Sequence, residues 1–68
     1  MKVYRIQHIE SGLFHTGGTM FYDYHCSATG KVYTRQIGIK SLLSGVGGLP
    51  DGYRVVEYEL NEGKEIEL

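Results

Sequence analysis

The sequence predicts an α+β domain in which a small antiparallel sheet of four to five strands carries one helix on one face. Three observations support this prediction. Apolar and polar residues alternate along most of the chain, the spacing changes to about 3.6 residues in one segment, and glycine-containing turns separate these segments. The predicted order of elements is strand, strand, strand, helix, strand.

The first predicted strand covers residues 3–9, where Tyr4, Ile6 and the other even-numbered residues share one face. Residues 10–12 then supply turn chemistry, because a glycine can adopt a positive φ. We therefore expect residues 13–15 to fold back as the short second arm of a hairpin.

The next two predicted strands form a second hairpin. Residues 19–26 are dense in aromatic side chains, which favour strands. Residues 27–30 form a short loop with a glycine in its last position, and residues 31–35 alternate again. This pairing of 19–26 with 31–35 is the clearest local prediction from the sequence.

One amphipathic helix is predicted from Gln36 onwards. Thr34 or a close neighbour is the expected cap of its start, and the glycines after residue 44, with Pro50 beyond them, mark its end. The helix is indicated by four apolar residues at helical spacing, namely Ile39, Leu42, Leu43 and Val46.

The glycine turn after the helix also exposes main-chain N–H groups that can bind anions, and residues 17–18 offer a second such turn.

The last predicted strand runs from Tyr53 to Leu60 and follows a turn built from proline, aspartate and glycine. We expect it to pair beside the first strand. Its predicted inner face, which meets the helix, contains Val56, Tyr58 and Leu60, and its predicted outer face contains Val55, Glu57 and Glu59. Residues 1–60 then form a single domain, and residues 61–68 form an acidic, frayed tail.

The length and composition predict a soluble domain of marginal stability. A chain of 68 residues, 41% of them hydrophobic, buries a small core, and association into a homo-oligomer is therefore expected. Cys26 is the single cysteine, which excludes an internal disulfide and favours a reducing compartment. We expect neither a leader peptide nor a membrane span, and hence a cytoplasmic location.

The net charge of −1 hides an asymmetry along the chain. Residues 1–56 carry six Lys and Arg against three acidic residues, a balance of +3, whereas residues 57–68 carry five Glu against Lys64, a balance of −4. An acidic end of this kind is most often a solvated segment, and less often an interaction arm or a mask over a basic surface.

The histidine, cysteine and acidic residues of the chain do not form a catalytic or metal-binding motif. Three histidines and Cys26 supply four metal donors, but His25 and Cys26 are adjacent and would point to opposite faces of a strand. The chain lacks a nucleophile motif, and Glu57 with Glu59 fit an exposed acidic alternation better than a catalytic pair. We therefore expect no enzyme, no metal and no cofactor.

Aromatic and cationic residues together indicate a site for a small anion. A whole-chain pI near 6.3 argues against a long nucleic acid, because such binding depends on neutralising many phosphates. A nucleotide-like ligand needs one or two cations and an aromatic face, and a pocket shared between subunits would suit so small a chain. The candidate ligand-binding residues are Tyr4, Arg5, Lys31, Tyr33, Arg35 and Arg54.

The chain also resembles the short accessory proteins of tailed bacteriophages. The matching segments are Tyr4-Arg5-Ile6, Gly12-Leu13-Phe14, Gly17-Gly18, Gly30-Lys31-Val32-Tyr33, Ile39-Lys40-Ser41-Leu42-Leu43 and Gly52 to Leu60. The resemblance implies a viral protein that acts in the cytoplasm of an infected bacterium by binding a host molecule. The expected role is anti-defence, by sequestration of a nucleotide-like immune signal. The alternatives are an inhibitor that docks directly on a host protein and, third, a structural protein of the virion.

Overall fold

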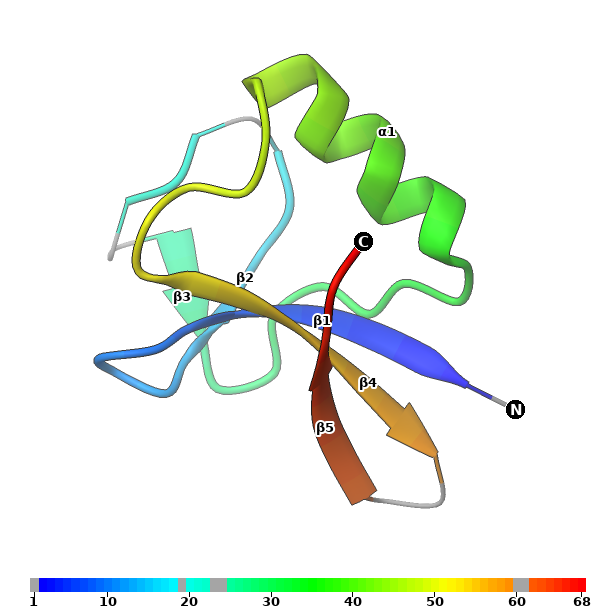
Figure 1. Ribbon diagram of the computed structural model, residues 1–68. Coiled ribbons are helices and arrows are strands. Elements are labelled where there is room, and N and C mark those ends of the chain that lie inside the picture. The colour runs from blue at the N-terminus through cyan, green and yellow to red at the C-terminus, as the bar shows by residue number, and fades with distance from the viewer. Residues whose placement is uncertain (1, 19, 23–24, 60–61) are drawn as a thin grey trace.

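Five strands form one antiparallel sheet, and a helix crosses one face of it, in the computed structural model (Figure 1). The structure describes residues 2–18, 20–22, 25–59 and 62–68. The elements are β1 (Val3–His8), β2 (Phe14–His15), β3 (Cys26–Ser27), α1 (Gln36–Val46), β4 (Tyr53–Glu59) and β5 (Glu62–Ile66). The spatial order of the strands is β3-β2-β1-β4-β5. This architecture confirms the predicted α+β class.

The centre of the sheet is the pair formed by β1 and β4. These strands are antiparallel over the whole length of β1, from Val3 opposite Tyr58 to His8 opposite Tyr53. On its other side β1 pairs with β2, with Gln7 opposite Phe14, which confirms the predicted first hairpin. The predicted position of the last long strand beside the first is confirmed as well.

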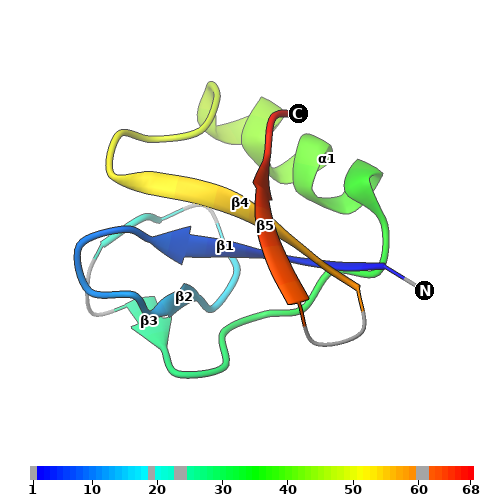
Figure 2. The ribbon, with the colours of Figure 1, turned by 60° about the horizontal axis from the view of Figure 1, so that its bottom comes forward.

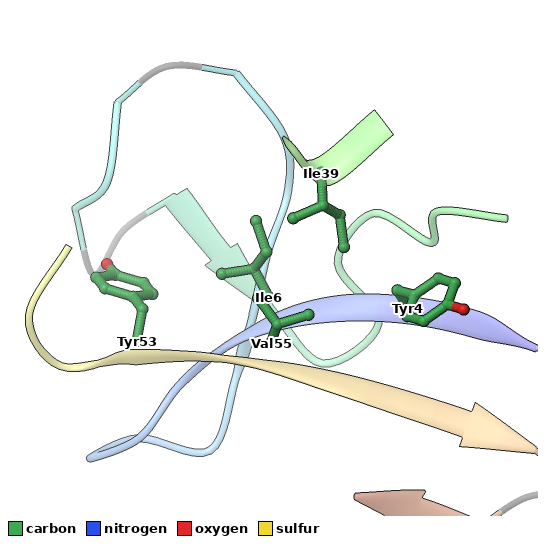
Figure 3. Close-up of a cluster of buried hydrophobic side chains, with 5 residues drawn as sticks. All are labelled: Tyr4, Ile6, Ile39, Tyr53 and Val55. Atoms are coloured by element: carbon green, nitrogen blue, oxygen red, sulfur yellow. The ribbon is translucent and has the colours of Figure 1, made fainter. Parts of the chain in front are cut away.

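The core lies between the sheet and α1. Ile6 and Ile39 are fully buried, and Val55 is 2% exposed, so one side chain each from β1, α1 and β4 meets at the centre (Figure 3). Tyr4 and Tyr53 extend this cluster along the sheet. Burial of each of these aliphatic side chains contributes roughly 1.5–3 kcal/mol, which makes this cluster the main source of stability.

The helix begins and ends where its local sequence permits. Gln36–Val46 confirms the predicted helix, although its N-cap is Arg35, whose side chain makes no capping hydrogen bond. At the other end Gly47 takes the left-handed conformation with φ 90°, and the N–H of Gly48 donates to the carbonyl of Leu43 at 2.7 Å. Residues with a Cβ disfavour that conformation, so the glycine run ends the helix here.

The face of β4 that meets the helix is the opposite of the predicted one. Tyr53, Val55 and Glu57 point to the helix side, because Val55 stands opposite Ile6 and belongs to the core. Val56 and Tyr58, which were predicted to contact α1, lie on the other face, and Leu60 lies outside the described residues. The side chains on both faces of β4 are partly apolar, so composition does not determine which face meets the helix. The pairing register with β1 determines it.

The predicted hairpin of residues 19–26 with 31–35 is wrong. Of the first segment, residues 20–22 lie outside the strands, and residues 19, 23 and 24 lie outside the described part of the chain. Cys26–Ser27 instead pairs with Phe14–His15. The second segment contributes an isolated bridge, in which Tyr33 pairs with Tyr4.

Residues 62–66, which the sequence predicted as part of a frayed tail, form β5 and pair with β4. The register places Lys64 opposite Glu57 and Ile66 opposite Val55, and these contacts, with the ion pair of Arg54 and Glu65, add to the main-chain pairing of the strand. Figure 2 shows the chain leaving β5 and turning towards α1. Among the described residues no helix is long and apolar enough to cross a membrane.

Candidate functional site

The structure separates the six predicted ligand-binding residues into four places. Tyr4 belongs to the core, Lys31 and Tyr33 lie on one segment that runs beside β2 and β1, and Arg35 is exposed at the start of α1. Arg5 and Arg54 share the face of the sheet opposite the helix, because they alternate with core residues of β1 and β4. We call this surface the open face and treat it as the candidate site.

The side chain of Arg5 is held between two aromatic rings on the open face. Its guanidinium carbon lies 3.9 Å from the centroid of Phe14 and 4.4 Å from that of Tyr58. The two ring centroids are 6.4 Å apart and the ring planes are inclined by 67°, so the rings meet edge to face and the guanidinium packs against both of them. These two contacts restrict the position of the guanidinium before any ligand arrives.

Hydrogen bonding leaves much of the Arg5 guanidinium available for a ligand. Nη1 donates to the carbonyl of Thr29 at 3.1 Å. A guanidinium has five N–H donors, and within the described part of the chain this is its single hydrogen bond. A cation fixed in position with donors to spare is suited to bind an oxyanion.

Arg54 is held in a different way. Its Nε donates to the side-chain carbonyl of Gln7 at 2.7 Å, and its Nη1 lies 3.7 Å from a carboxylate oxygen of Glu65. Both members of this ion pair are well exposed, so the pair contributes little to stability. An anionic ligand can therefore replace Glu65 beside Arg54 at small cost.

The register brings the two arginines together. Arg5 stands opposite Val56 and Arg54 stands opposite Gln7, which makes Arg5 and Arg54 diagonal neighbours on one face. Such neighbours lie roughly 7–8 Å apart. From these positions the guanidinium of Arg5 reaches towards Thr29, whereas that of Arg54 reaches towards Glu65 of β5. The open face thus combines paired cations with flanking aromatic rings.

Two residues of this site, Phe14 and Tyr58, were missed in the sequence. The sequence predicts Tyr58 in the core, because the alternation of β4 alone does not show which of its faces meets the helix. Phe14 was placed in the second strand, but its position opposite Gln7, on the same face as Arg5, depends on the register of the hairpin. The useful signal was the parity of Arg5 and Gln7, which places both on the face opposite Ile6.

Gly63 of β5 allows the ring of Tyr58 to lie flat over the edge of the sheet. The two residues are directly opposite each other, and a Cβ on Gly63 would lie 2.5 Å from Cε2 of Tyr58. A larger residue would displace the ring and with it one side of the Arg5 stack. The strand at the edge therefore shapes the candidate site.

The segment with Lys31 and Tyr33 forms a separate feature at the edge of β1. The main chains of Tyr33 and Tyr4 exchange two hydrogen bonds, of 2.7 and 2.8 Å. Nζ of Lys31 lies 5.2 Å from the ring centroid of Tyr33. Burial raises the pKa of the Tyr33 hydroxyl, because the charged phenolate would lose hydration there.

The two buried histidines have structural contacts on the helix side. Nδ1 of His15 accepts the N–H of Gly17 at 3.2 Å, which leaves Nε2 to donate to the carbonyl of Met20 at 2.7 Å. Its ring stacks on Phe21, with centroids 3.9 Å apart. His8 lies farther along the same face. Across the described residues, no group of three or more His, Cys, Asp or Glu side chains is placed to hold a metal ion.

The sequence predicts that Glu57 belongs to an exposed acidic alternation, and this prediction is wrong. Its side chain is 7% exposed, and Nζ of Lys2 and Nζ of Lys64 each lie 3.7 Å from its Oε1. The two lysines offset the cost of burying this carboxylate. Glu59 is exposed, so the two carboxylates differ in environment.

Comparisons of the chain with protein-family models, curated proteins and solved structures found no match.

Proposed function

We propose that this chain is a non-enzymatic binding protein that holds a small nucleotide-like anion on its open face. The observation that carries the proposal is the arginine pair, with Arg5 fixed between Phe14 and Tyr58 and Arg54 beside it. The resemblance of the sequence to bacteriophage accessory proteins supplies the biological setting. In that setting the ligand is an immune signal of the infected bacterium, sequestered in the host cytoplasm.

The geometry favours a phosphate group between the two arginines. Their main-chain positions lie roughly 7–8 Å apart, so a rotation of the long Arg54 side chain away from Glu65 would bring both guanidinium groups to one phosphate or two neighbouring phosphates. Preorganisation by the two rings reduces the entropy lost on binding, because the Arg5 side chain is already ordered. Phe14, which is half-buried, adds an aromatic surface beside the cations, and stacking of a base on an aromatic ring contributes about 1–3 kcal/mol.

A homo-oligomer would complete such a site. Ligand pockets cover about 70–90% of a small ligand, which a single sheet face does not achieve. A second copy placed against the open face would close over the ligand and also bury more apolar surface for a chain of 68 residues. We therefore include a homo-oligomer, with ligand between subunits, in the proposal.

The test is a titration of linear mono-, di- and triphosphates and of cyclic mono-, di- and trinucleotides, read by thermal unfolding. A ligand present at 100 times its Kd stabilises the protein by about 2.7 kcal/mol. Arg5→Met should abolish the shift for the nucleotide that binds. Arg35→Met is the matched control, since it removes the same charge from the exposed start of α1 and should leave the shift intact.

Two results would reject the proposal. The first is the absence of a shift with every nucleotide class. The second is an equal loss of the shift in Arg5→Met and Arg35→Met, because binding would then depend on overall charge and not on the open face. Glu65→Gln sharpens the test: it removes the carboxylate that competes for Arg54 and should tighten binding.

A further inference from the structure

A groove separates the C-terminal half of α1 from the end of β5. Its volume is about 580 Å³, within the range of small-molecule and side-chain pockets. Leu43 on α1, Leu49 after the helix, and Ile66 and Leu68 at the end of the chain give it apolar walls. Leu49 and Leu68 are 40% and 43% exposed, so apolar surface faces solvent here. None of these residues belongs to the open face.

The groove adjoins the free edge of the sheet. β5 stands at the end of the strand order, and within the described chain no strand pairs with its outer side. Its outward main-chain N–H and C=O groups can therefore accept a further strand. Ile66 faces the helix side, because it stands opposite Val55 of the core. A side chain opposite Ile66 on an added strand would share that face and point into the groove.

The charges around this edge define the chemistry of such a strand. Glu62 lies on β5, Glu65 points to the opposite face from Ile66, and Glu67 lines the groove together with one cation, Lys40 of α1. Residues 57–68 carry a balance of −4, with five Glu against Lys64. The complementary segment is therefore basic as well as apolar.

A second copy of this chain would bring the same net-acidic edge to the contact. Antiparallel pairing of β5 with its own copy about Lys64 would place two lysines opposite each other, and pairing about Glu65 would do the same with two glutamates. Like charges directly opposite each other are destabilising. These two registers therefore disfavour self-pairing, although pairing about Gly63 would place Glu62 opposite Lys64, whereas a basic strand has opposite charge to the glutamates of the edge in general.

We propose that the outer edge of β5 and the adjoining groove form a docking site for an extended segment of a partner protein, in which apolar and basic residues alternate. The segment adds as a strand beside β5. One apolar side chain enters the groove between Leu43 and Ile66, and basic side chains contact Glu65 and Glu67. This site shares Glu65 with Arg54 of the open face, but it does not rest on nucleotide binding.

The test uses a capped seven-residue peptide of alternating valine and arginine, labelled with a fluorophore and titrated at physiological salt. The expected Kd is below about 1 mM. The same peptide N-methylated at alternate residues cannot pair as a strand and should bind at least tenfold more weakly. A third peptide with serine in place of valine should lose affinity to the same extent.

Two protein variants locate the site. Glu67→Lys should weaken the valine–arginine peptide at least tenfold, whereas Glu10→Lys makes the same charge change at the exposed turn after β1 and should not. Both positions are exposed, and unchanged melting of each variant verifies folding. The proposal is overturned if the first peptide does not bind, if N-methylation has no effect, or if the two variants weaken binding equally.

Discussion

The two faces of the sheet use the same strands for different purposes. On the helix side, β1 and β4 contribute Ile6 and Val55 to a closed apolar core. On the open face the alternate residues of these strands include Arg5 and Arg54, held by ring stacking and a hydrogen bond. Because side chains of a strand alternate, a chain of 68 residues can separate stability from recognition without a second domain.

The two faces also differ in the free energy that each side chain contributes. A buried aliphatic side chain contributes roughly 1.5–3 kcal/mol, whereas a cation–π contact at a partly exposed site contributes about 0.5–1 kcal/mol. Substitutions on the open face should therefore leave the fold intact. Substitutions on the helix side should not, and the following predictions test this difference.

The largest effect is expected at the centre of the core. Ile39→Ala should lower the free energy of unfolding by about 2–5 kcal/mol, because it leaves a cavity at a fully buried position. Urea unfolding measures the change. Ile37→Ala is the matched control on the same helix, 66% exposed, and should change stability by less than about 0.5 kcal/mol. Equal effects would show that α1 does not bury the Ile39 face.

A smaller effect is expected at the edge that supports the open face. Gly63→Ala places a methyl group 2.5 Å from Cε2 of Tyr58 and should cost about 1–3 kcal/mol. Gly45→Ala, in α1 with open space around it, should instead stabilise by about 0.5–1 kcal/mol. In a Tyr58→Ala background the cost of Gly63→Ala should largely disappear, and persistence of the full cost there would contradict this account of the glycine.

The contacts of Arg5 with the two rings should contribute less to the free energy of unfolding than Ile39 or Gly63. Arg5→Met keeps an unbranched side chain between Phe14 and Tyr58 but removes the cation, and we expect a loss of about 1–2 kcal/mol from two cation–π contacts. Arg35→Met should be close to neutral in the same urea experiment. If the two arginine variants unfold alike, the stack is not preorganised.

The smallest effect concerns pH. Burial raises the pKa of Tyr33 in the folded protein, whereas the pKa of an exposed tyrosine is about 10, so the unfolded chain loses this proton first. The contribution of the neutral hydroxyl to stability is complete below about pH 10 and is lost as the pH rises through the folded pKa. Tyr33→Phe should reduce the loss of stability between about pH 9 and pH 11, measured by urea unfolding at each pH. An identical loss in both proteins would exclude Tyr33 as the cause.

The elements with one dominant local signal were predictable from the sequence. The helix has a single apolar stripe around Ile39 and a glycine stop at Gly47, and β1 alternates around Ile6. In β4, however, Val55 and Val56 are equally apolar and both are buried, so local sequence does not determine which one meets the helix. The pairing with β1 determines it, and that information is non-local.

The remaining errors have related causes. The aromatic alternation around Phe21 resembles a strand, yet Phe21 packs against the core from a loop and stacks on His15. β5 has weak strand propensity and depends on its pairing with β4, where Lys64 meets Glu57. The candidate site was predictable in part: Arg5 and Arg54 share a face, but the rings around Arg5 depend on register.

The most direct test of the central claim is an NMR titration that observes the arginine Nε–H signals together with the main-chain amides. With a nucleotide that raises the melting temperature, the Nε–H signals of Arg5 and Arg54 should shift together with amides of β1 and β4. The signal of Arg35 should stay in place. Shifts of Arg35 without Arg5 and Arg54, or shifts confined to α1 and the groove beside it, would contradict a ligand site on the open face.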